Sequence, residues 1–495
     1  MRRGSTVHHV TSKKSPKYLS QFLAAFAVSL GPFAAGLGKG YSSPAIASLQ
    51  DHQGTWRNST VLTVTPQQAS WVASLSLLGA LFGALLGGFA MRFGRRRILI
   101  VTSVPFSMSW IATVFANCVE MMFITAFLGG FCCSIILTVT QVYISEIAVR
   151  DIRGILSALQ KIVGHMGMLL SFSVGAWLDW RQLAAIVCLA PLLLCFGALY
   201  VPESPSYLAL CGRDAEAARS LQWLRGPTAD IRLELATIRT NVLASRQNHI
   251  LRPPAPRDIM NRLWKPALTT CGLMFFQRFS GANAFNFYAV SIFRQTFGGM
   301  NPHGAAVAVC FVQLLASLLS GLLIDTVGRI PLLIASSVFM SLALAGFGSC
   351  AYYVSHQRLK FTSNNLGTLA LTPAMGGEHD WIPLLCVLIF TIAFSLGISP
   401  ISSLLSSELF PLEYRALGSS MAMSFSYACA FIGVKTFVDF QEWLGLHGAF
   451  WLYAAISMAG LSFVICFVPE TKGKDMDEMN PKYVQSLAIV SPPNR

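Results

Sequence analysis

The sequence predicts an all-α membrane protein in which twelve transmembrane helices form two pseudo-symmetric halves of six helices each. Three observations support this fold class: a composition poor in charge, a series of long apolar runs, and three motifs that recur in the same order along the chain. Only 12% of the 495 residues are charged, whereas 54% are hydrophobic. Soluble domains usually carry about a quarter charged residues, so this chain must turn apolar side chains outward to lipid.

Twelve apolar runs are long enough to cross a bilayer, which takes roughly 20 helical residues. The first run is too long and too rich in glycine for a signal peptide, and no cleavage site of small residues follows it. The expected spans are residues 19–40, 67–90, 98–117, 122–144, 155–177, 183–201, 266–290, 303–325, 331–354, 381–405, 416–438 and 447–468.

The basic residues predict that both chain ends are cytoplasmic. Outside the segment 202–265, 17 Lys and Arg flank the spans on the side of the N-terminus, against 5 on the other side. Cytoplasmic loops carry such an excess, so the net charge of +14 reports topology and argues against nucleic acid as a partner. The sequon that begins at Asn58 then lies outside the cell, where it could be glycosylated.

The two halves share three motifs at equivalent places among their spans. The pairs are Gly94-Arg95 with Gly328-Arg329, Glu146 and Arg153 with Glu408 and Arg415, and Pro202-Glu203 with Pro469-Glu470. A parallel repeat of six spans explains this order. We therefore expect a cytoplasmic N-terminus over 1–18, six-helix halves over 19–201 and 266–468, a cytoplasmic linker with short amphipathic helices over 202–265, and a cytoplasmic tail over 469–495.

A resemblance to a known family rests on seven stretches. They are Gly94-Arg-Arg-Arg97, Tyr143-Ile-Ser-Glu146, Pro202-Glu-Ser-Pro-Ser-Tyr-Leu208, Ser280-Gly-Ala-Asn283, Asp325-Thr-Val-Gly-Arg329, Glu408-Leu-Phe-Pro411 and Pro469-Glu-Thr-Lys-Gly473. Together they resemble the sugar-porter family of the major facilitator superfamily, and in particular its insect facilitated trehalose-transporter-like members. The resemblance implies the major facilitator fold, a plasma-membrane location, and a substrate site between the halves near the midplane.

The family's sugar site, carried over residue by residue, falls on four uncharged amides: Gln160, Gln277, Asn283 and Gln313. Amides can donate to and accept from several sugar hydroxyls without the desolvation cost of a charge. The alternative is that these polar side chains hold helices together inside the membrane.

The same region departs from the family pattern. The second glutamine of the family's span-seven pair is Arg278, the cavity tryptophan of span ten is Ser403, and the asparagine of span eleven is Ser426. Lys39 stands where span one usually offers an aromatic residue, and Lys435 is a further charge at membrane depth. Such charges are costly and usually face a cavity or a partner. For each residue taken alone, pairing or snorkelling at span ends is the simpler interpretation, and a site altered toward an anionic or otherwise unusual substrate is the alternative. Arg278 is the exception, because the family register points it at the cavity.

Charged motif residues at the cytoplasmic span ends are expected to form a gate. Arg95 and Arg329 can pair with nearby carboxylates, and Asp325 is retained in the second half, whereas its first-half counterpart is Met91. The clusters expected to join the halves when the inside is closed are Glu146, Arg153 and Glu203 with Glu408, Arg415 and Glu470. The alternative is that these charges only anchor the topology.

The resemblance favours facilitated diffusion of a sugar such as hexose or trehalose by alternating access. The family's proton-coupling acid falls on Ser42, and His165 is expected to be a packed neutral histidine. No nucleotide-binding, serine-hydrolase or zinc-protease motif occurs, so no enzyme activity, cofactor or metal is expected. A sensor or receptor that binds sugar without transporting it remains the alternative. The oligomeric state is left open.

Overall fold

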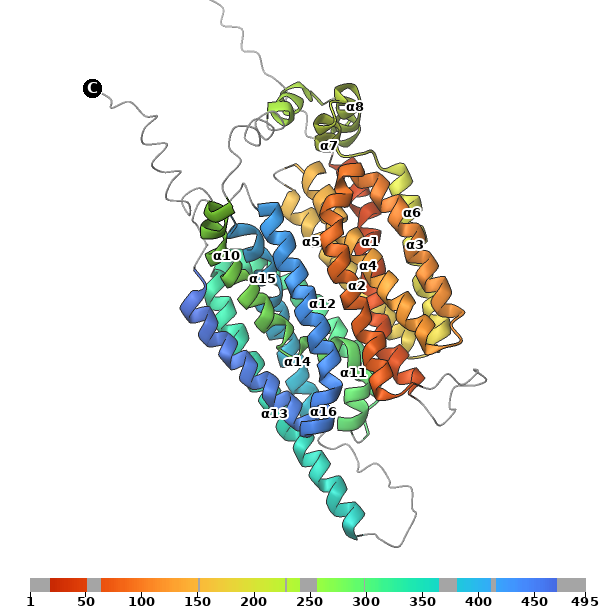
Figure 1. The fold of residues 1–495 in the computed structure, drawn as a ribbon, viewed down its shortest axis with the longest axis vertical. Coiled ribbons are helices and arrows are strands. Elements are labelled where there is room, and N and C mark those ends of the chain that lie inside the picture. Colours follow the sequence, from red (N-terminus) through yellow and green to blue (C-terminus); the bar gives the residue numbers. More distant parts are fainter. Residues whose placement is uncertain are drawn as a thin grey trace, which may run out of the picture.

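The structure is a computed structural model in which long helices lie side by side and short helices cross one end (Figure 1). The described residues are 18–50, 64–149, 152–227, 229–240, 256–297, 299–364, 381–410 and 415–469. Within them the regular elements are helices throughout, as the sequence predicts for an all-α membrane protein.

The first group of long helices, the N-terminal bundle, packs around a core of aliphatic and aromatic side chains that includes Leu37, Phe106 and Ile136. Its helices are α1 (Leu19–Leu49), α2 (Pro66–Ala90) with the 3-10 turn η1 (Met91–Phe93), α3 (Arg95–Val114), α4 (Val119–Ile147), α5 (Arg153–Gly175) and α6 (Trp180–Tyr200). Small residues allow close approach: a Cβ added at Gly79 of α2 would lie 2.0 Å from the carbonyl oxygen of Phe127 on α4.

The second group, the C-terminal bundle, has a core rich in phenylalanine. The ring of Phe285 packs on those of Phe347, Phe390 and Phe450, with centroids 5.0 to 5.5 Å apart. Its helices are α10 (Pro256–Arg278), α11 (Ala282–Thr296), α12 (Pro302–Val327), α13 (Arg329–Asn364), α14 (Trp381–Leu396), α15 (Ile398–Glu408) and α16 (Arg415–Phe467).

The chain between α6 and α10 contains short helices that lie across one end of the molecule, here named the α7–α8 end (Figure 1). They are α7 (Pro205–Leu210), α8 (Asp214–Arg225) and the helical residues 232–240. Arg225 fixes them to the bundle, since its guanidinium donates to the carbonyl of Ile147 at 2.9 Å and pairs with Glu234 at 2.6 Å. Ser220 adds a hydrogen bond of 2.5 Å to the carbonyl of Glu203.

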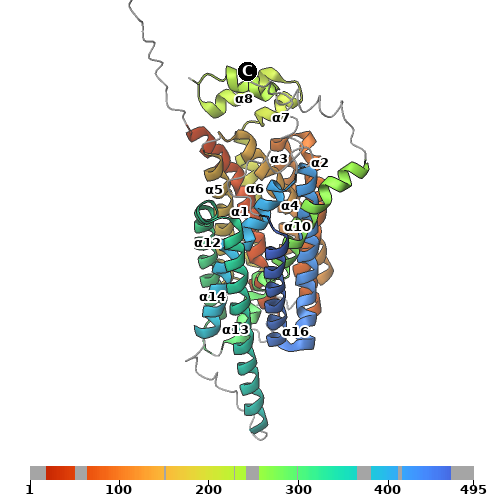
Figure 2. The same ribbon diagram turned by 90° about the vertical axis from the view of Figure 1, so that its left-hand side faces the viewer.

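Ten segments of the described residues are long and apolar enough to cross a membrane, against the twelve expected. The difference has two causes. The expected span 266–290 is broken between α10 and α11, while the expected spans 416–438 and 447–468 join in the 53-residue α16. At Gly445, with φ of 72°, α16 reverses, and its two arms run side by side (Figure 2). Both features arise at glycines with positive φ, which most other residues avoid.

Helix α13 extends ten residues beyond the expected end at 354 and projects from the end opposite α7 and α8 (Figure 1). At 1.5 Å per residue, its 36 residues exceed the roughly 30 Å of a bilayer core. The helix therefore reaches past the membrane on that side.

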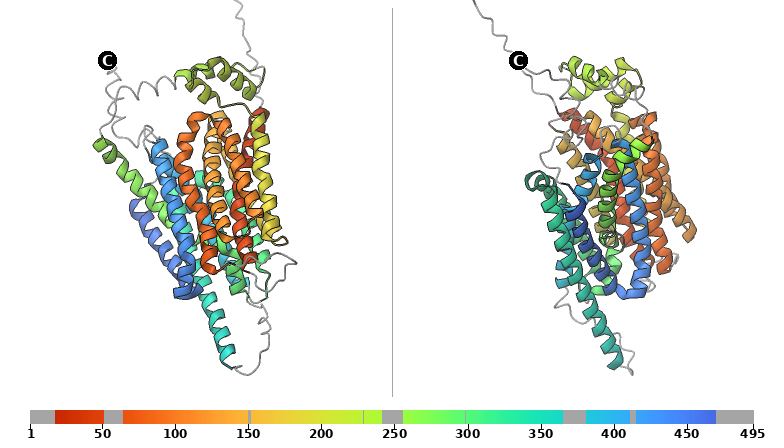
Figure 3. Two further views of the ribbon diagram at one scale, coloured as in Figure 1. Left: turned by 45° about the vertical axis from the view of Figure 1, so that its right-hand side comes forward. Right: turned by 60° about the vertical axis from the view of Figure 1, so that its left-hand side comes forward.

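Three helix pairs bring the two bundles together: α1 packs on α11, α2 on α16, and α5 on α12. Figure 3 shows α2 and α16 as neighbours along the bundle interface. The start of α2 is set by a capping box in which the Thr65 hydroxyl accepts from the Gln68 amide, and the Gln68 side chain accepts from the Thr65 amide. This cap positions Gln67 and Ser70, which contact α16.

Candidate functional site

A cavity of about 390 Å³ lies between the two bundles. Helices α1 to α5 form most of its wall, and α10, α11, α12 and α16 supply the rest. Its apolar lining includes Trp110 of α3 and Phe287 of α11. A mostly apolar pocket with a few convergent polar groups has the general form of a small-molecule site.

Three of the four expected amides line this cavity: Gln160 of α5, Asn283 of α11 and Gln313 of α12. Gln277 is buried outside the lining, where its amide donates to the carbonyl of Ser399 at 3.3 Å. A further amide, Asn286, lines the cavity one helical turn after Asn283. Sequence reasoning missed Asn286, although its spacing of three residues from Asn283 could have revealed it.

The break between α10 and α11 brings the span-seven residues to the cavity. Helix α10 ends at Arg278, the chain turns at Gly281 in the left-handed conformation with φ of 86°, and α11 begins at Ala282. Across the turn, the Asn283 amide donates to the carbonyl of Arg278 at 3.1 Å. The broken helix therefore places both Arg278 and Asn283 in the cavity wall.

Arg278 is held by neutral partners. Its Nε donates to the Ser426 hydroxyl at 2.7 Å, and the guanidinium carbon lies 5.8 Å from the centre of the Tyr427 ring. Ser426 is buried, so it orients Arg278 and does not line the cavity. Ser403 also lies outside the lining, and its hydroxyl donates to the carbonyl of Pro400 at 2.8 Å.

Other ionisable side chains also reach the cavity. Lys39 of α1 and Lys161 of α5 line it, and so does His165, which the sequence suggested would be packed. The His165 Nδ1 donates to the carbonyl of Lys161 at 2.9 Å, and its Nε2 lies 3.4 Å from the hydroxyl of Ser317 on α12. His165 thus sits at the contact between the two bundles.

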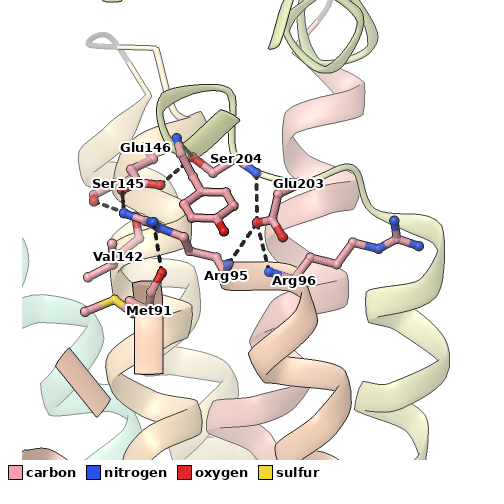
Figure 4. Close-up of polar contacts among 9 residues, drawn as sticks. Met91, Arg95, Arg96, Val142, Ser145, Glu146, Glu203 and Ser204 are labelled. Carbon is pink, nitrogen blue, oxygen red and sulfur yellow. Dashed lines mark hydrogen bonds and ion pairs between the residues drawn. The ribbon is translucent and has the colours of Figure 1, made fainter. Parts of the chain in front are cut away.

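A network of polar contacts lies at the α7–α8 end of the N-terminal bundle (Figure 4). Arg95 forms an ion pair of 2.7 Å with Glu146 and donates to the carbonyl of Met91 at 3.2 Å. The backbone carbonyl of Met91 thus contacts Arg95 at the position where the family usually has Asp. The Ser204 hydroxyl donates to Glu146 from the segment that follows α6.

Glu203 caps the start of α3. One of its carboxylate oxygens accepts from the backbone amides of Arg95 at 2.9 Å and Arg96 at 3.0 Å (Figure 4). A carboxylate at a helix N-terminus satisfies free amides and complements the helix dipole. Arg95, Glu146 and Glu203 therefore lie together within the N-terminal bundle.

Other expected gate and modification residues cannot be placed in this way. Arg329 follows Gly328 directly and is half buried at the start of α13. The side chains of Arg153, Asp325, Glu408 and Arg415, and the whole of Glu470 and Asn58, lie outside the described part of the chain.

Sequence reasoning missed a polar contact between the bundles at the end opposite α7 and α8. The Lys435 ammonium of α16 donates to Gln67 Oε1 at 2.9 Å and to the Ser70 hydroxyl at 3.0 Å. The Gln67 amide donates to Asp439 at 2.9 Å, one turn further along α16. These four residues, Gln67, Ser70, Lys435 and Asp439, are named the α2–α16 clasp. The spacing Lys435-x3-Asp439 was the available signal.

A second contact joins α1 and α11. The Ser43 hydroxyl accepts from the backbone amide of Val290 at 3.0 Å. The amide belongs to α11, whose helix geometry is interrupted at Tyr288 with φ of −126°. An interrupted helix frees backbone groups, and Ser43 satisfies one of them from the other bundle.

This chain is similar to known proteins along almost its whole length. Residues 25–483 match the family described as Sugar (and other) transporter. The facilitated trehalose transporter Tret1 of Polypedilum vanderplanki is 36% identical over 96% of this chain and 91% of its own length. Tret1 of Drosophila pseudoobscura pseudoobscura is also 36% identical over 96% of this chain, which spans about half (53%) of that relative.

Solved structures share the fold. An inward open conformation of the xylose transporter XylE from E. coli matches with a TM-score of 0.71 and 21% identity, over 93% of this chain and 99% of that one. The proton:xylose symporter XylE bound to 6-bromo-6-deoxy-D-glucose matches with a TM-score of 0.71 and 23% identity, over 94% and 99%. The predicted fold class, an all-helical membrane protein of the major facilitator type, is confirmed.

Proposed function

Because this chain belongs to the sugar (and other) transporter family, and is thus a multi-pass membrane transporter and not an enzyme, we propose that it carries a sugar across the plasma membrane by facilitated diffusion. The observation that carries this proposal is the cavity of about 390 Å³ between the two bundles. Its wall combines apolar side chains with the amides of Gln160, Asn283 and Gln313. Such a lining supports binding of a molecule that has many hydroxyl groups and a compact ring.

The relatives suggest the size of the sugar. The 36% identical proteins from Polypedilum and Drosophila are facilitated trehalose transporters, so a hexose or a disaccharide such as trehalose is the first class to assay. Trp110 and Phe287 offer aromatic surface in the same cavity. Aromatic faces suit the apolar faces of sugar rings, while the amides bond the hydroxyls at the rim.

Alternating access is supported by where the bundles are tied. The α2–α16 clasp joins them at the end opposite α7 and α8. At the α7–α8 end, Arg95 and Glu146 bond to each other, and Glu203 caps α3 within the same bundle. This arrangement fits a state closed by the clasp, with the paired gate motifs of the two halves engaged in the opposite state.

Transport driven by the sugar gradient alone fits the cavity's chemistry. Ser42 lines the cavity at the position of the family's proton-coupling acid. Among the described residues that line the cavity, none is Asp or Glu. The family's proton-coupled mechanism uses an acid at this position, and a serine hydroxyl does not take up or release a proton near neutral pH.

The proposal includes the topology expected from the sequence. Both termini are placed in the cytoplasm, with six-helix halves over 19–201 and 266–468 joined by 202–265. The α7–α8 end then faces the cytoplasm and the clasp faces outward. Asn58, if it is glycosylated, lies on the outer side.

Uptake by proteoliposomes tests this function. Purified full-length protein should exchange labelled glucose or trehalose for unlabelled sugar, and a protonophore should leave the exchange unchanged. Gln160→Leu and Gln313→Leu should each raise the half-saturating sugar concentration about tenfold, since each removes a hydrogen-bonding group from the site. Gln295→Leu is the matched control, because Gln295 is exposed at the end of α11 and does not line the cavity.

The main alternative, a sensor that binds without transporting, predicts a different result. Sugar would then protect the protein against thermal unfolding, with loss of protection in Gln160→Leu, while exchange stayed at the level of empty liposomes. Exchange abolished by a protonophore would overturn the gradient-driven mechanism and leave sugar transport standing.

A further inference from the structure

Lys39 is a cation inside the membrane-spanning bundle for which the described residues offer no ion-pair or hydrogen-bond partner. It lies in α1, a helix of 31 residues, and its side chain is exposed to the central cavity. Within the described residues, no carboxylate or hydrogen-bond acceptor is in contact with its ammonium. A charge at membrane depth is costly unless it is paired or solvated, so a bare ammonium in a cavity wall indicates a partner that arrives from solution.

A second cation faces Lys39 from the other bundle. Arg278 of α10 lines the same cavity as Lys39. Its described partners, Ser426 and Tyr427, are neutral. These contacts orient the guanidinium but leave its positive charge uncompensated, and beyond the Nε–H that bonds to Ser426 the guanidinium has four more N–H groups that can bind a ligand.

The rest of the lining does not compensate either charge. Lys161 and His165 add basic groups, and none of the described lining residues is Asp or Glu. The described ion pair between Arg95 and Glu146 lies at the α7–α8 end and does not line the cavity. The cavity therefore has a positive field, which attracts anions and is strengthened by the low dielectric around it.

The neutral side chains of the same cavity define the remainder of the ligand. Gln160, Asn283, Asn286 and Gln313 are suited to hydroxyl groups, as argued above. A molecule that satisfies both sets of groups carries several hydroxyls and one anionic group. Carboxylate and phosphate oxygens are the acceptors that Arg and Lys bind best.

Building on the proposed transport function, we propose that the substrate is an acidic sugar, whose carboxylate or phosphate binds between Lys39 and Arg278 while its hydroxyls contact the amides. Because Lys39 belongs to α1 and Arg278 to α10, the anion would join the two bundles. It would also remove the repulsion between the two cations across the bundle interface. Binding and closure of the carrier around its substrate are then coupled through charge.

Competitive exchange in proteoliposomes tests the proposal. Glucose, glucuronate and glucose 6-phosphate share one ring but differ in charge, so they separate the need for an anion from the kind of anion. The proposal expects at least one acidic sugar to be exchanged with about tenfold or greater efficiency over glucose, the size expected of a charge-assisted hydrogen bond. Equal or faster exchange of glucose would overturn it and leave sugar transport intact.

Variants locate the effect. Lys39→Gln and Arg278→Gln should each lower the ratio of acidic-sugar exchange to glucose exchange about tenfold. Lys39→Arg should retain the preference because it retains the charge. Lys265→Gln is the matched control, since Lys265 is exposed on α10 and contacts the Trp264 ring. An unchanged ratio of acidic to neutral sugar in both glutamine variants contradicts the proposal.

Thermal stability separates binding from transport. In detergent, glucuronate or glucose 6-phosphate should raise the unfolding temperature more than glucose does, and Lys39→Gln should remove the difference. If this shift occurs without exchange of any sugar, the anion site stands and the transport function falls. If neither exchange nor an acid-specific shift is seen, the acidic-sugar proposal is overturned.

Discussion

The ammonium of Lys435 on α16 lies 2.9 Å from Oε1 of Gln67 on α2, and this hydrogen bond joins the two bundles at the end opposite α7 and α8. The same ammonium lies 5.1 Å from the centre of the Trp71 ring. Asp439 completes the arrangement by accepting from the Gln67 amide at 2.9 Å. A lysine inside an apolar helix is therefore satisfied by residues of the other bundle. Its hydrogen bonds exist only while the two bundles are in contact at this end.

Removing this cation should favour opening at that end. Lys435→Met deletes two charge-assisted hydrogen bonds, so the population opened there should rise about tenfold or more. Cys133, which lines the cavity, is the natural reporter. A membrane-impermeant thiol reagent added on the clasp side should modify Cys133 faster in Lys435→Met, as measured by peptide mass spectrometry.

The matched control for this experiment is Thr436→Ala. Thr436 is the next residue on α16, and its hydroxyl bonds within its own helix to the carbonyl of Ile432. It should leave the modification rate at the wild-type value. If Lys435→Met also leaves the rate unchanged, the clasp does not control access from that side.

Gly94 should not tolerate a side chain. Its φ is 108°, and a Cβ would lie 2.8 Å from the Glu203 carboxylate that caps α3. Gly94→Ala should therefore destabilise the protein by roughly 1–3 kcal/mol, through backbone strain and a displaced cap. Gly321→Ala should be neutral or stabilising, because the helical Gly321 has open space around its Cβ position. Melting in detergent compares the two, and equal melting temperatures would refute the expected strain.

Arg95 and Glu146 should be energetically coupled. Their side chains are only 13% and 17% exposed, so the pair is poorly screened and each partner left alone is costly. A double-mutant cycle with Arg95→Met and Glu146→Gln should give a coupling energy of about 1–3 kcal/mol in reversible unfolding from mixed micelles. A coupling energy within error of zero would show that the ion pair does not stabilise the fold, and that these charges only help to set the orientation of the chain in the membrane.

A side chain added in the turn between α10 and α11 should lower the transport rate. Gly281 has φ of 86°, and an added Cβ would lie 3.1 Å from the Tyr453 ring. Gly281→Ala should lower the maximal exchange rate several-fold or more, because strain of about 1–3 kcal/mol would fall on the turn that carries Arg278 and Asn283. Gly304→Ala on α12, where the nearest neighbour is 3.8 Å away, is the control. A reduced rate in both variants would not support a special role for the turn.

The long helices could be predicted from the sequence because lipid exposure leaves a strong compositional signal. The reversal of α16 at Gly445 was also predictable, because it falls between the expected spans 416–438 and 447–468. The break at Gly281 was less visible, since it lies within the single expected span 266–290 and is marked only by a glycine with positive φ. A glycine in an apolar run is equally suited to close packing, as at Gly79, so composition cannot tell these uses apart.

The candidate site was predictable where the position of a residue along a regular helix decides whether its side chain reaches the cavity. Gln160 and Gln313 reach the cavity, as the resemblance implied, whereas Gln277 turns to the carbonyl of Ser399 just before its helix ends. Partners far apart in the chain could not be predicted. Lys435 and Gln67 are 368 residues apart, and nothing in either segment alone indicates that they meet.

The absence of a carboxylate among the described residues around Lys39 has an electrical consequence. If an acidic sugar crosses without a compensating cation, each cycle moves negative charge across the membrane, and the carrier generates current. Moving one charge through 100 mV is worth about 2.3 kcal/mol, which corresponds to a concentration ratio of roughly fifty-fold. Membrane voltage, and not concentration alone, would then set the direction of net flux, and a cell with a negative interior would export such a substrate.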